Sequence, residues 1–421
     1  MSLIDENQKP IKVGILSHGF TGWGGGIDFI RHMLSYLDEE QKSDSGLQKI
    51  LVLPREDLLE KIKLATYPFR NLINQLIACK GIVWRSRPGF SSGYLEKTFE
   101  DFSKTSDIIF AAPNLQSQLA AALESGVDIV FPCMSIPPAN FHLPWIGYLF
   151  DFQHHHLPEF FSKSEIQSRN KAFGQMLNSA KHIVVYGEEV IRDADRFYPG
   201  HTAKLHALPF CPCPQPAWLL SALDAREKFH IERPYFLVSN QFWKHKDHVT
   251  AFRAFGEYCA KGGEADLVCT GATEDYRFPG YYSELLKLIS DLKIEGRIKI
   301  LGHISKFDQI SLMRNSLAVV QTTLFEGGAG GGCSYDAISL GVPVIVSDIP
   351  INRELSCGDV TFFAASNFEK LADALLVRGL EPYARETNDE LLRKGLERRK
   401  LAGKVLKNIF NEAIEDATSS R

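Results

Sequence analysis

A glycine-rich turn between two acidic residues is the stretch of this chain best suited to chemistry. Five glycines fall within the six positions 327–332, between Glu326 and Asp336. Glycines let a ligand approach the backbone closely, and free amides where a helix begins can hold the oxygens of a diphosphate. Carboxylates accept hydrogen bonds from the hydroxyls of a sugar or a ribose. The turn therefore predicts a site for a ligand that carries a diphosphate and hydroxyls; a mobile loop with an exposed glutamate is the alternative.

A basic cluster lies in the sequence SNQFWKHK at 239–246. It directly follows a predicted strand, and open α/β sheets bind their ligands at strand ends. Its lysines, Lys244 and Lys246, can stabilise negative charge that develops on a leaving phosphate. A solvated basic loop is the alternative interpretation.

A second glycine turn stands near the start of the chain, where Gly24, Gly25 and Gly26 precede a predicted helix. Its spacing lacks the G-x-G-x-x-G pattern, with an acidic residue about 20 positions on, that marks dinucleotide binding. A turn that faces a phosphate and a plain strand-to-helix turn both fit this pattern.

Three consecutive histidines, His154, His155 and His156, follow closely after Asp151. Consecutive side chains diverge, so they are poorly placed to hold one ion together, and no companion metal motif is present. We therefore predict no metal site here, and expect a polar loop at a strand end with one histidine pointing into a cleft.

The elements that must position these residues can be predicted from apolar runs and their spacing. Continuous apolar runs predict buried parallel strands at 11–16, 50–53, 108–111, 129–131, 145–149 and 182–186, and further along at 235–239, 265–270, 298–301, 317–321 and 342–346. Helices are predicted at 27–37, 249–261, 281–292, 306–315 and 334–340. Four prolines in the eleven positions 207–217 indicate a linker. We expect two α/β domains with mostly parallel sheets, followed by an amphipathic helix at about 388–417.

The bulk composition excludes several classes of protein. The 421 residues are 44% hydrophobic and 23% charged with a net charge of −4, so no strong overall field attracts nucleic acid. No apolar run is long enough to span a bilayer, and the N-terminus lacks a signal-peptide pattern. The eight cysteines match no zinc-ribbon spacing, which favours free thiols in the cytoplasm. Cys211 and Cys213 fit a pair of loop thiols better than a redox pair.

The chain resembles the family 4 glycosyltransferases over most of its length. Leu324-Phe-Glu-Gly-Gly through Asp336-Ala-Ile-Ser-Leu-Gly-Val-Pro-Val-Ile-Val-Ser-Asp348 is similar to the family's E-G-F-G…E-A-x-x-x-G-x-P-V-I-x-x-D signature. Further similarities are the glycines at 24–26, the stretch 151–158, Lys246, the stretch 301–304 and Glu354. The resemblance implies the α/β GT-B fold, in which two Rossmann-like, doubly wound domains face each other across a cleft and a C-terminal helix crosses back. The expected domains are an acceptor-binding domain at 1–210, a nucleotide-sugar-binding domain at 211–395 and the crossover helix at 396–421.

The same resemblance implies a retaining, metal-independent transfer of a hexose from a nucleotide-diphosphate sugar, with no separate cofactor. UDP-glucose is the expected donor from its frequency in the family. The acceptor is expected to be a saccharide or lipid-linked molecule in the synthesis of a bacterial cell-envelope polysaccharide. We expect a cytoplasmic protein, monomeric or weakly dimeric, that does not bind nucleic acid.

Positions that match the family's motifs suggest a role for each site residue. Glu326, Lys246 and His154 are expected to be catalytic, and Glu326, Gly327, Gly328 and Asp151 to bind the donor sugar. The residues expected to bind the donor diphosphate are Gly25, Gly26, Asn240, Lys244, Lys246, Gly331, Gly332, Cys333 and Ser334. Asp336, His303 and Ile304 are expected to bind the nucleoside.

Two departures concern the groups around the donor. The spacing from Glu326 to Asp336 is E-x9-D, whereas the family has E-x7-E, so the second acidic residue lies two positions later and its side chain is one methylene shorter. The family's arginine shortly before the lysine is absent. Either Lys244 supplies its charge or the site is less cationic.

A third departure concerns the histidine. Phe150 stands where many relatives carry a histidine before the aspartate, which leaves His154 or His156 for that role. These departures keep two alternatives open: a noncatalytic nucleotide-sugar- or polysaccharide-binding protein, and a GT-B sugar-nucleotide epimerase. The cofactor-lysine motif of a phosphorylase is absent, and the weak first glycine turn argues against an NAD oxidoreductase.

Basic residues are interleaved with apolar ones between positions 58 and 104. They include Lys61, Lys63, Arg70, Lys80, Arg85 and Arg87, beside apolar residues such as Leu72, Ile73 and Trp84. The pattern predicts peripheral contact with the inner face of a membrane or with an anionic lipid acceptor. An ordinary helix with snorkelling basic side chains is the alternative.

Overall fold

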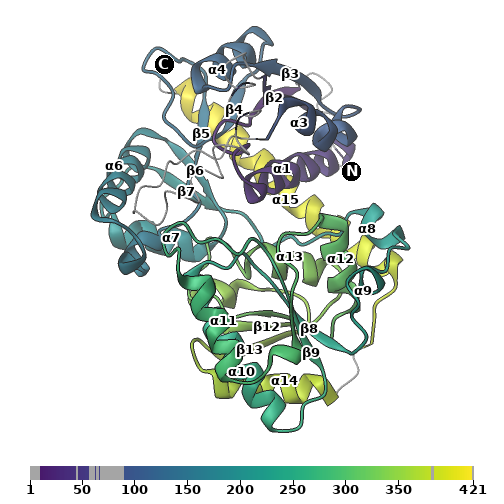
Figure 1. Ribbon diagram of the computed structural model, residues 1–421. Helices are drawn as coiled ribbons and strands as arrows, with labels where there is room; N and C mark the ends of the chain where they lie inside the picture. Colours follow the sequence, from purple (N-terminus) through teal and green to yellow (C-terminus); the bar gives the residue numbers. More distant parts are fainter. Residues whose placement is uncertain are drawn as a thin grey trace.

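The computed structural model describes residues 10–43, 46–55, 62, 66, 90–380 and 384–419. Over these residues the chain forms two α/β domains, one above the other in Figure 1, each built on a parallel sheet. The two-domain α/β prediction is confirmed.

The first domain surrounds a seven-stranded sheet of order β3-β2-β1-β4-β5-β6-β7. Its strands are β1 (Ile11–Leu16), β2 (Leu47–Pro54), β3 (Asp107–Ala111), β4 (Ile129–Cys133), β5 (Trp145–Tyr148), β6 (His182–Val185) and β7 (Lys204–Ala207). Its helices are α1 (Gly24–Ser43), α3 (Ser92–Phe99), α4 (Leu115–Glu124), α5 (Gln153–His156), α6 (Lys163–Ser179) and α7 (Glu188–Phe197). β1 and β4 are almost wholly apolar because helices cover both faces of the central strands.

The second domain surrounds a six-stranded sheet of order β10-β9-β8-β11-β12-β13. Its strands are β8 (Tyr235–Ser239), β9 (Asp266–Thr270), β10 (Ile298–Ile300), β11 (Val319–Gln321), β12 (Val344–Asp348) and β13 (Val360–Ala364). Its helices are α8 (Pro216–Leu220), α9 (Ala225–Lys228), α10 (His248–Ala260), α11 (Tyr281–Asp291), α12 (Lys306–Asn315), α13 (Gly331–Ser339) and α14 (Phe368–Leu380). Both sheets are doubly wound, with the strand order reversing between β1 and β4 and between β8 and β11.

Among the described strands, β7 and β13 were missed by the sequence patterns, and both lie at the edge of their sheet. Their residues are largely half-buried, so they lack the continuous apolar run that marks a central strand. β7 ends at Ala207, where the predicted linker begins, and the chain then runs without regular structure to α8. Cys211 and Cys213 in this linker are buried and free, and burial raises the pKa of the Cys211 thiol to about 12.

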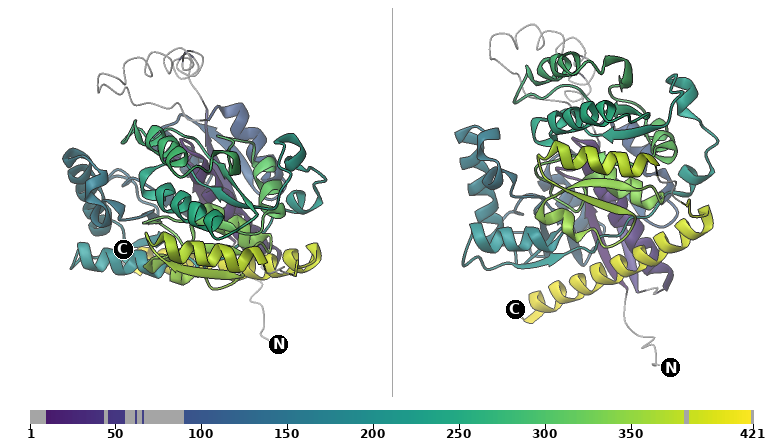
Figure 2. Two further views of the ribbon diagram at one scale, coloured as in Figure 1. Left: turned by 60° about the horizontal axis from the view of Figure 1, so that its bottom comes forward. Right: turned by 90° about the horizontal axis from the view of Figure 1, so that it is seen from below.

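The last helix, α15 (Asn388–Ser419), ties the two domains together. Leu391 near its start belongs to the core of the second domain, whereas Leu406 and Phe410 belong to the core of the first. Gly403 lets α15 lie directly against α1, because a Cβ there would collide with the carbonyl of Tyr36. Figure 2 shows this helix, in yellow, running past both domains. The domain limit predicted at 395/396 falls inside this continuous helix.

A second tie comes from Glu354, in the short helix η5 (Pro350–Glu354) of the second domain. Its carboxylate accepts hydrogen bonds from the backbone amides of Glu188 (3.0 Å) and Glu189 (2.6 Å). These amides open α7 in the first domain, where a helix N-terminus attracts negative charge. Glu354 therefore acts as a cap across the domain boundary.

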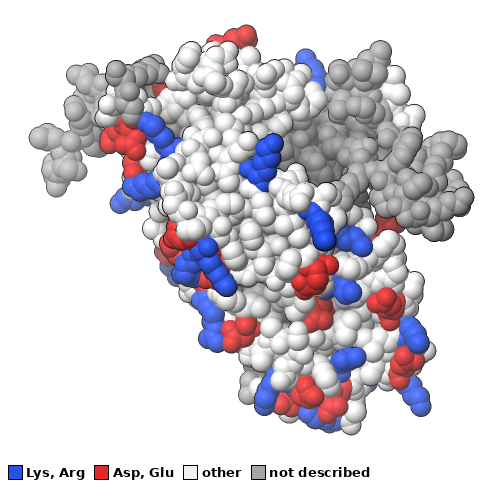
Figure 3. Space-filling model, turned by 90° about the vertical axis from the view of Figure 1, so that its left-hand side faces the viewer, with Lys and Arg blue, Asp and Glu red and all other residues white. Residues whose placement is uncertain are grey.

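The surface in Figure 3 carries acidic and basic side chains intermixed over the lower part of the molecule. In the described parts of the chain, no helix is long and apolar enough to cross a membrane. The basic residues that predicted a membrane-facing surface, from Lys61 to Arg87, lie outside the described residues, so that expectation stays a prediction.

Candidate functional site

The candidate site lies where the second sheet reverses its strand order. β8 and β11 are neighbours, and the segments that leave their carboxyl ends carry the two most suggestive motifs. Chains leaving such a switch point diverge and open a crevice. Lys246 follows β8 within the short helix η3 (Lys244–Lys246), and Glu326 follows β11 five residues after Gln321.

Lys246 and Glu326 form an ion pair between Nζ and Oε1. Only 15% of the lysine side chain and 10% of the glutamate side chain are exposed. Because little water reaches either charge, each one is stabilised mainly by the opposite charge of its partner. The Thr322 hydroxyl donates to the carbonyl of Lys246 (2.7 Å) and holds η3 against the end of β11. The two motifs, 80 residues apart in sequence, are thus joined into one site.

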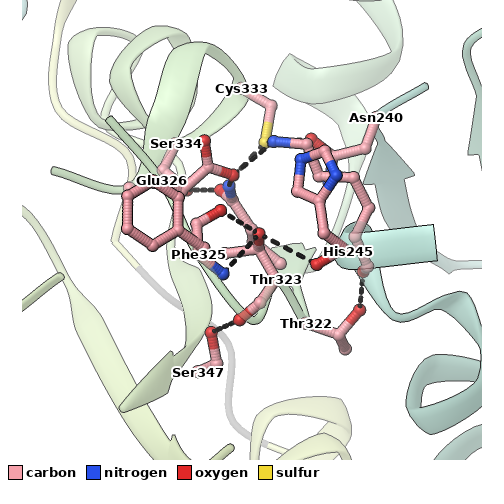
Figure 4. Close-up of polar contacts among 12 residues, drawn as sticks. Asn240, His245, Thr322, Thr323, Phe325, Glu326, Cys333, Ser334 and Ser347 are labelled. Atoms are coloured by element: carbon pink, nitrogen blue, oxygen red, sulfur yellow. Dashed lines mark hydrogen bonds and ion pairs between the residues drawn. The ribbon is translucent and has the colours of Figure 1, made fainter. Parts of the chain in front are cut away.

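Figure 4 shows Glu326 close to Cys333 and Ser334 at the start of α13. Gln321 links these residues through hydrogen bonds. Its Nε2 donates to Glu326 Oε1 (2.6 Å), while its Oε1 accepts from the Ser334 hydroxyl (2.6 Å) and lies 3.1 Å from Cys333 Sγ. The amide is fully buried. Gln321 was not predicted from the sequence. It could have been noticed as a polar residue at the end of an apolar strand, directly before two threonines.

The glycines at 327–332 allow close packing on two sides. Gly330 and Gly331 adopt left-handed backbone conformations, with φ of +65° and +60°. A Cβ at Gly331 would lie 2.9 Å from both Gln321 Nε2 and the Glu326 carboxyl carbon. A Cβ at Gly327 would lie 2.5 Å from the Phe150 carbonyl of the first domain. The turn therefore lies between Glu326 and the first domain.

Asp151 lies on the first-domain side of this junction. An added Cβ at Gly327 would come within 3.1 Å of the Asp151 Cβ. The Asp151 carboxylate accepts from the backbone amide of Gln153 (3.0 Å) and pairs with Arg169 (3.4 Å). Burial raises the pKa of Asp151, and the nearby Glu326 charge raises it further. The structure thus brings Asp151, Gly327 and Glu326 together, and their role in binding a donor sugar stays a prediction.

The histidines of α5 point in opposite directions. His154 is buried, with Nε2 2.9 Å from Asn170 Oδ1 and its ring against Phe173, and burial lowers its pKa to about 4. His156 pairs with Asp193 (2.7 Å), and its ring centroid lies 5.1 Å from that of Phe325, the neighbour of Glu326. Helical residues two apart differ by about 200° in direction. His156, and not the predicted His154, therefore faces the glycine turn.

Two basic side chains lie near the basic cluster where the family's arginine is missing, and one of them comes from another loop. Lys244, the predicted substitute, places its Nζ 4.5 Å from the centroid of the Phe278 ring. Arg277, in the loop after β9, lies 4.3 Å over Phe161 and has a buried Nε without a partner. Burial and then the charges of Lys246 and Arg277 lower the pKa of His245 to about 2. Arg277 was not predicted from the sequence, although it lies in a loop that follows the end of a predicted strand.

The residues predicted to bind the nucleoside are divided between two cavities. His303 and Ile304 line a cavity of about 180 Å³ at the carboxyl ends of β8 and β9, together with Asn240. The Nδ2 of Asn240 is buried without a partner, a donor available to a ligand. Asp336 instead pairs with Lys306 and lines another cavity of about 270 Å³, beside α1, α8 and α15. Burial raises the pKa of Asp336.

The first glycine turn is explained by local packing. A Cβ at Gly25 or Gly26 would collide with the Trp23 ring, and at Gly26 also with the carbonyl of Phe20. Both glycines belong to the first turn of α1, at the carboxyl end of β1. A tight strand-to-helix turn thus explains why glycines stand at these two positions. The proposed binding of a diphosphate by Gly25 and Gly26 stays a prediction.

Comparisons with known proteins bear on the fold and on the second domain. Residues 222–377 match the family model of glycosyl transferases group 1, while no curated protein sequence matches the chain. Sucrose-phosphate synthase from Thermosynechococcus elongatus is similar in structure, with 13% identity, 96% of this chain and 98% of that chain covered, and a TM-score of 0.61. Anabaena Alr3699/HepE, solved in complex with UDP-glucose, has 14% identity, 98% and 100% coverage and a TM-score of 0.55. The chain therefore has the predicted GT-B fold, and its second domain carries the match to the group 1 glycosyl transferases.

Proposed function

We propose that the protein is a retaining glycosyltransferase that moves a hexose from a nucleotide-diphosphate sugar to a saccharide or lipid-linked acceptor. The observation that carries this proposal is the largely buried Lys246–Glu326 pair at the switch point of a domain that matches the group 1 glycosyl transferases. Its chemistry suits a donor with both negative phosphates and neutral hydroxyls. Asp151 adds a second carboxylate from the other domain.

The donor is proposed to span the second domain from the cavity of Asn240, His303 and Ile304 to Glu326. The nucleoside would occupy that cavity, and the diphosphate would meet the Asn240 amide, Lys246 and the open backbone at Gly332, where an added Cβ meets nothing within 4 Å. A UDP-glucose-like donor is supported by the similar fold of Alr3699/HepE, which was solved with UDP-glucose.

The ion pair between Lys246 and Glu326 would break when the donor binds, and each side chain would bind the donor instead. Lys246 would turn to the phosphate oxygens, and Glu326 would accept hydrogen bonds from sugar hydroxyls, so neither charge stays buried alone. Arg277 adds positive charge near the same position. These cations can stabilise the charge on a leaving diphosphate without a metal ion, and this supports a metal-independent reaction.

Transfer would begin with cleavage of the bond between the anomeric carbon and the leaving phosphate oxygen, through an oxocarbenium-like centre. The acceptor oxygen would attack from the face that the phosphate leaves, and the phosphate would take the acceptor's proton. That course retains the anomeric configuration without a nucleophile from the protein. The glycine turn, packed between the two domains, would help to exclude water from the sugar.

A thermal-shift screen tests the donor proposal. UDP-, GDP- and ADP-glucose would each be added to the full chain, with the free nucleoside monophosphates as controls. We expect one nucleotide sugar to raise Tm. At a ligand concentration of a hundred times its Kd, binding adds about 2.7 kcal/mol to the free energy of unfolding. Release of nucleoside diphosphate in a pool of acceptors would then support transfer. Binding without release would favour the noncatalytic alternative, and conversion of the bound sugar to its epimer would favour the epimerase.

A further inference from the structure

A cluster of two histidines and two carboxylates lies at the edge of the first sheet, away from the Lys246–Glu326 site. His182 is on β6, His206 is on β7, and Glu412 and Asp416 are on α15. One ligand atom from each of His182, His206 and Glu412 lies within 4.8 Å of the others. Sequence reasoning predicted no metal site and did not consider these residues together.

The strand register and the helix repeat place these four side chains together. β6 and β7 are parallel neighbours, with His182 opposite Lys204 and Val184 opposite His206. The two histidines therefore point to the same face, one diagonal step apart. Glu412 and Asp416 are four residues apart, so they share one side of α15. In Figure 2 the C-terminal end of the yellow α15 lies beside the teal strands of the first domain.

The hydrogen bonds set the histidine tautomer in a way that suits a cation. His182 Nε2 lies 3.1 Å from Asp416 Oδ2, and a carboxylate only accepts, so Nε2 carries the proton. His182 Nδ1 then presents its lone pair to His206 Nε2, 3.0 Å away. A carboxylate that orients a histidine through its other ring nitrogen is the usual support of a histidine bound to metal. His182 is almost completely buried, which fixes its ring in place.

We propose that His182 Nδ1, His206 Nε2 and a Glu412 oxygen bind one divalent transition-metal cation, for which Zn²⁺ is the best fit. Two imidazoles and one carboxylate form a tetrahedral zinc set when water fills the fourth position. On binding, the His206 proton moves from Nε2 to Nδ1, so that Nε2 offers its lone pair. Lys204, which pairs with Glu412, has a side chain 59% exposed and can turn to solvent.

The cation would act as a clip between the end of α15 and the first domain. Asp416 is a positioning residue in this account, because it holds His182 without touching the metal. The proposal does not depend on the glycosyltransferase function, since the cluster shares no residue with the donor site.

Zinc binding to the full chain, freed of metal with a chelator, tests this proposal. We expect about one Zn²⁺ per chain by isothermal titration and metal analysis, and a higher Tm in its presence. Co²⁺ should give the intense visible absorption of a tetrahedral site. His206→Gln and Glu412→Gln should abolish the Tm rise and the Co²⁺ signal, and Asp416→Asn should weaken binding by roughly 10- to 100-fold.

His201→Gln is the matched control, because His201 pairs with Asp195 (3.0 Å) in the same domain but outside the cluster. It should bind zinc as the wild type does. Glu412→Gln changes a half-buried helix residue and should leave the metal-free fold intact, so that its loss of zinc is interpretable. Absence of binding to the wild type, or unchanged binding in both His206→Gln and Glu412→Gln, would overturn the proposal.

Discussion

Replacing Glu326 with glutamine should lower turnover of the nucleotide sugar by about 100-fold or more, while the protein stays folded. The amide keeps the shape of the side chain and can still accept from Lys246. It removes the negative charge that we assign to the sugar hydroxyls and to the positive centre formed as the diphosphate leaves. The readout is release of nucleoside diphosphate from the donor that raises Tm.

Glu369→Gln is the control for this experiment, because Glu369 is an exposed residue in the first turn of α14. It should retain full turnover. If Glu326→Gln kept full turnover, the assigned role would be wrong. If it lost its cooperative unfolding transition as well, Glu326 would instead be needed for the fold, through its bonds to Lys246 and Gln321.

Replacing Phe410 with alanine should lower the free energy of unfolding by about 3–5 kcal/mol. Phe410 is fully buried, and its ring packs against Phe131 of β4 at a centroid distance of 5.6 Å. The substitution leaves a cavity where α15 enters the core of the first domain. Denaturant unfolding followed by circular dichroism measures the change.

Leu401→Ala on the same helix is the matched control, since 55% of Leu401 is exposed. It should change the free energy of unfolding by less than about 0.5 kcal/mol. Equal losses from the two variants would contradict the prediction, because they would show that burial of Phe410 in the core of the first domain does not set the effect of Phe410→Ala.

The fold was largely predictable because its signals are local. Continuous apolar runs such as Tyr235–Ser239 mark buried central strands, and prolines between Ala207 and Pro216 mark the connection between domains. The edge strands β7 and β13 were missed because half-burial leaves no such run. The limits of α15 were less predictable, since one continuous helix serves both domains.

The candidate site was predictable only where motif residues meet at strand ends. Lys246 and Glu326 meet because β8 and β11 are adjacent, and Asp151 reaches them from the first domain. The direction of a side chain within a helix was not predictable, and so His156 replaces His154 beside the turn. Arg277 was missed because sequence spacing does not show which loop folds over another.

The central claim is that Lys246 holds the donor diphosphate, and its most direct test compares two neighbouring lysines. Affinity for the nucleotide sugar that gives the largest thermal shift would be measured by isothermal titration with Lys246→Met and Lys244→Met. Lys246 faces Glu326, whereas Lys244 packs on Phe278, so methionine keeps the apolar stem in both but removes a site charge in only one. We predict that Lys246→Met weakens binding by about 10-fold or more and that Lys244→Met changes it little. Wild-type affinity in Lys246→Met, or an equal loss in both variants, would contradict the account.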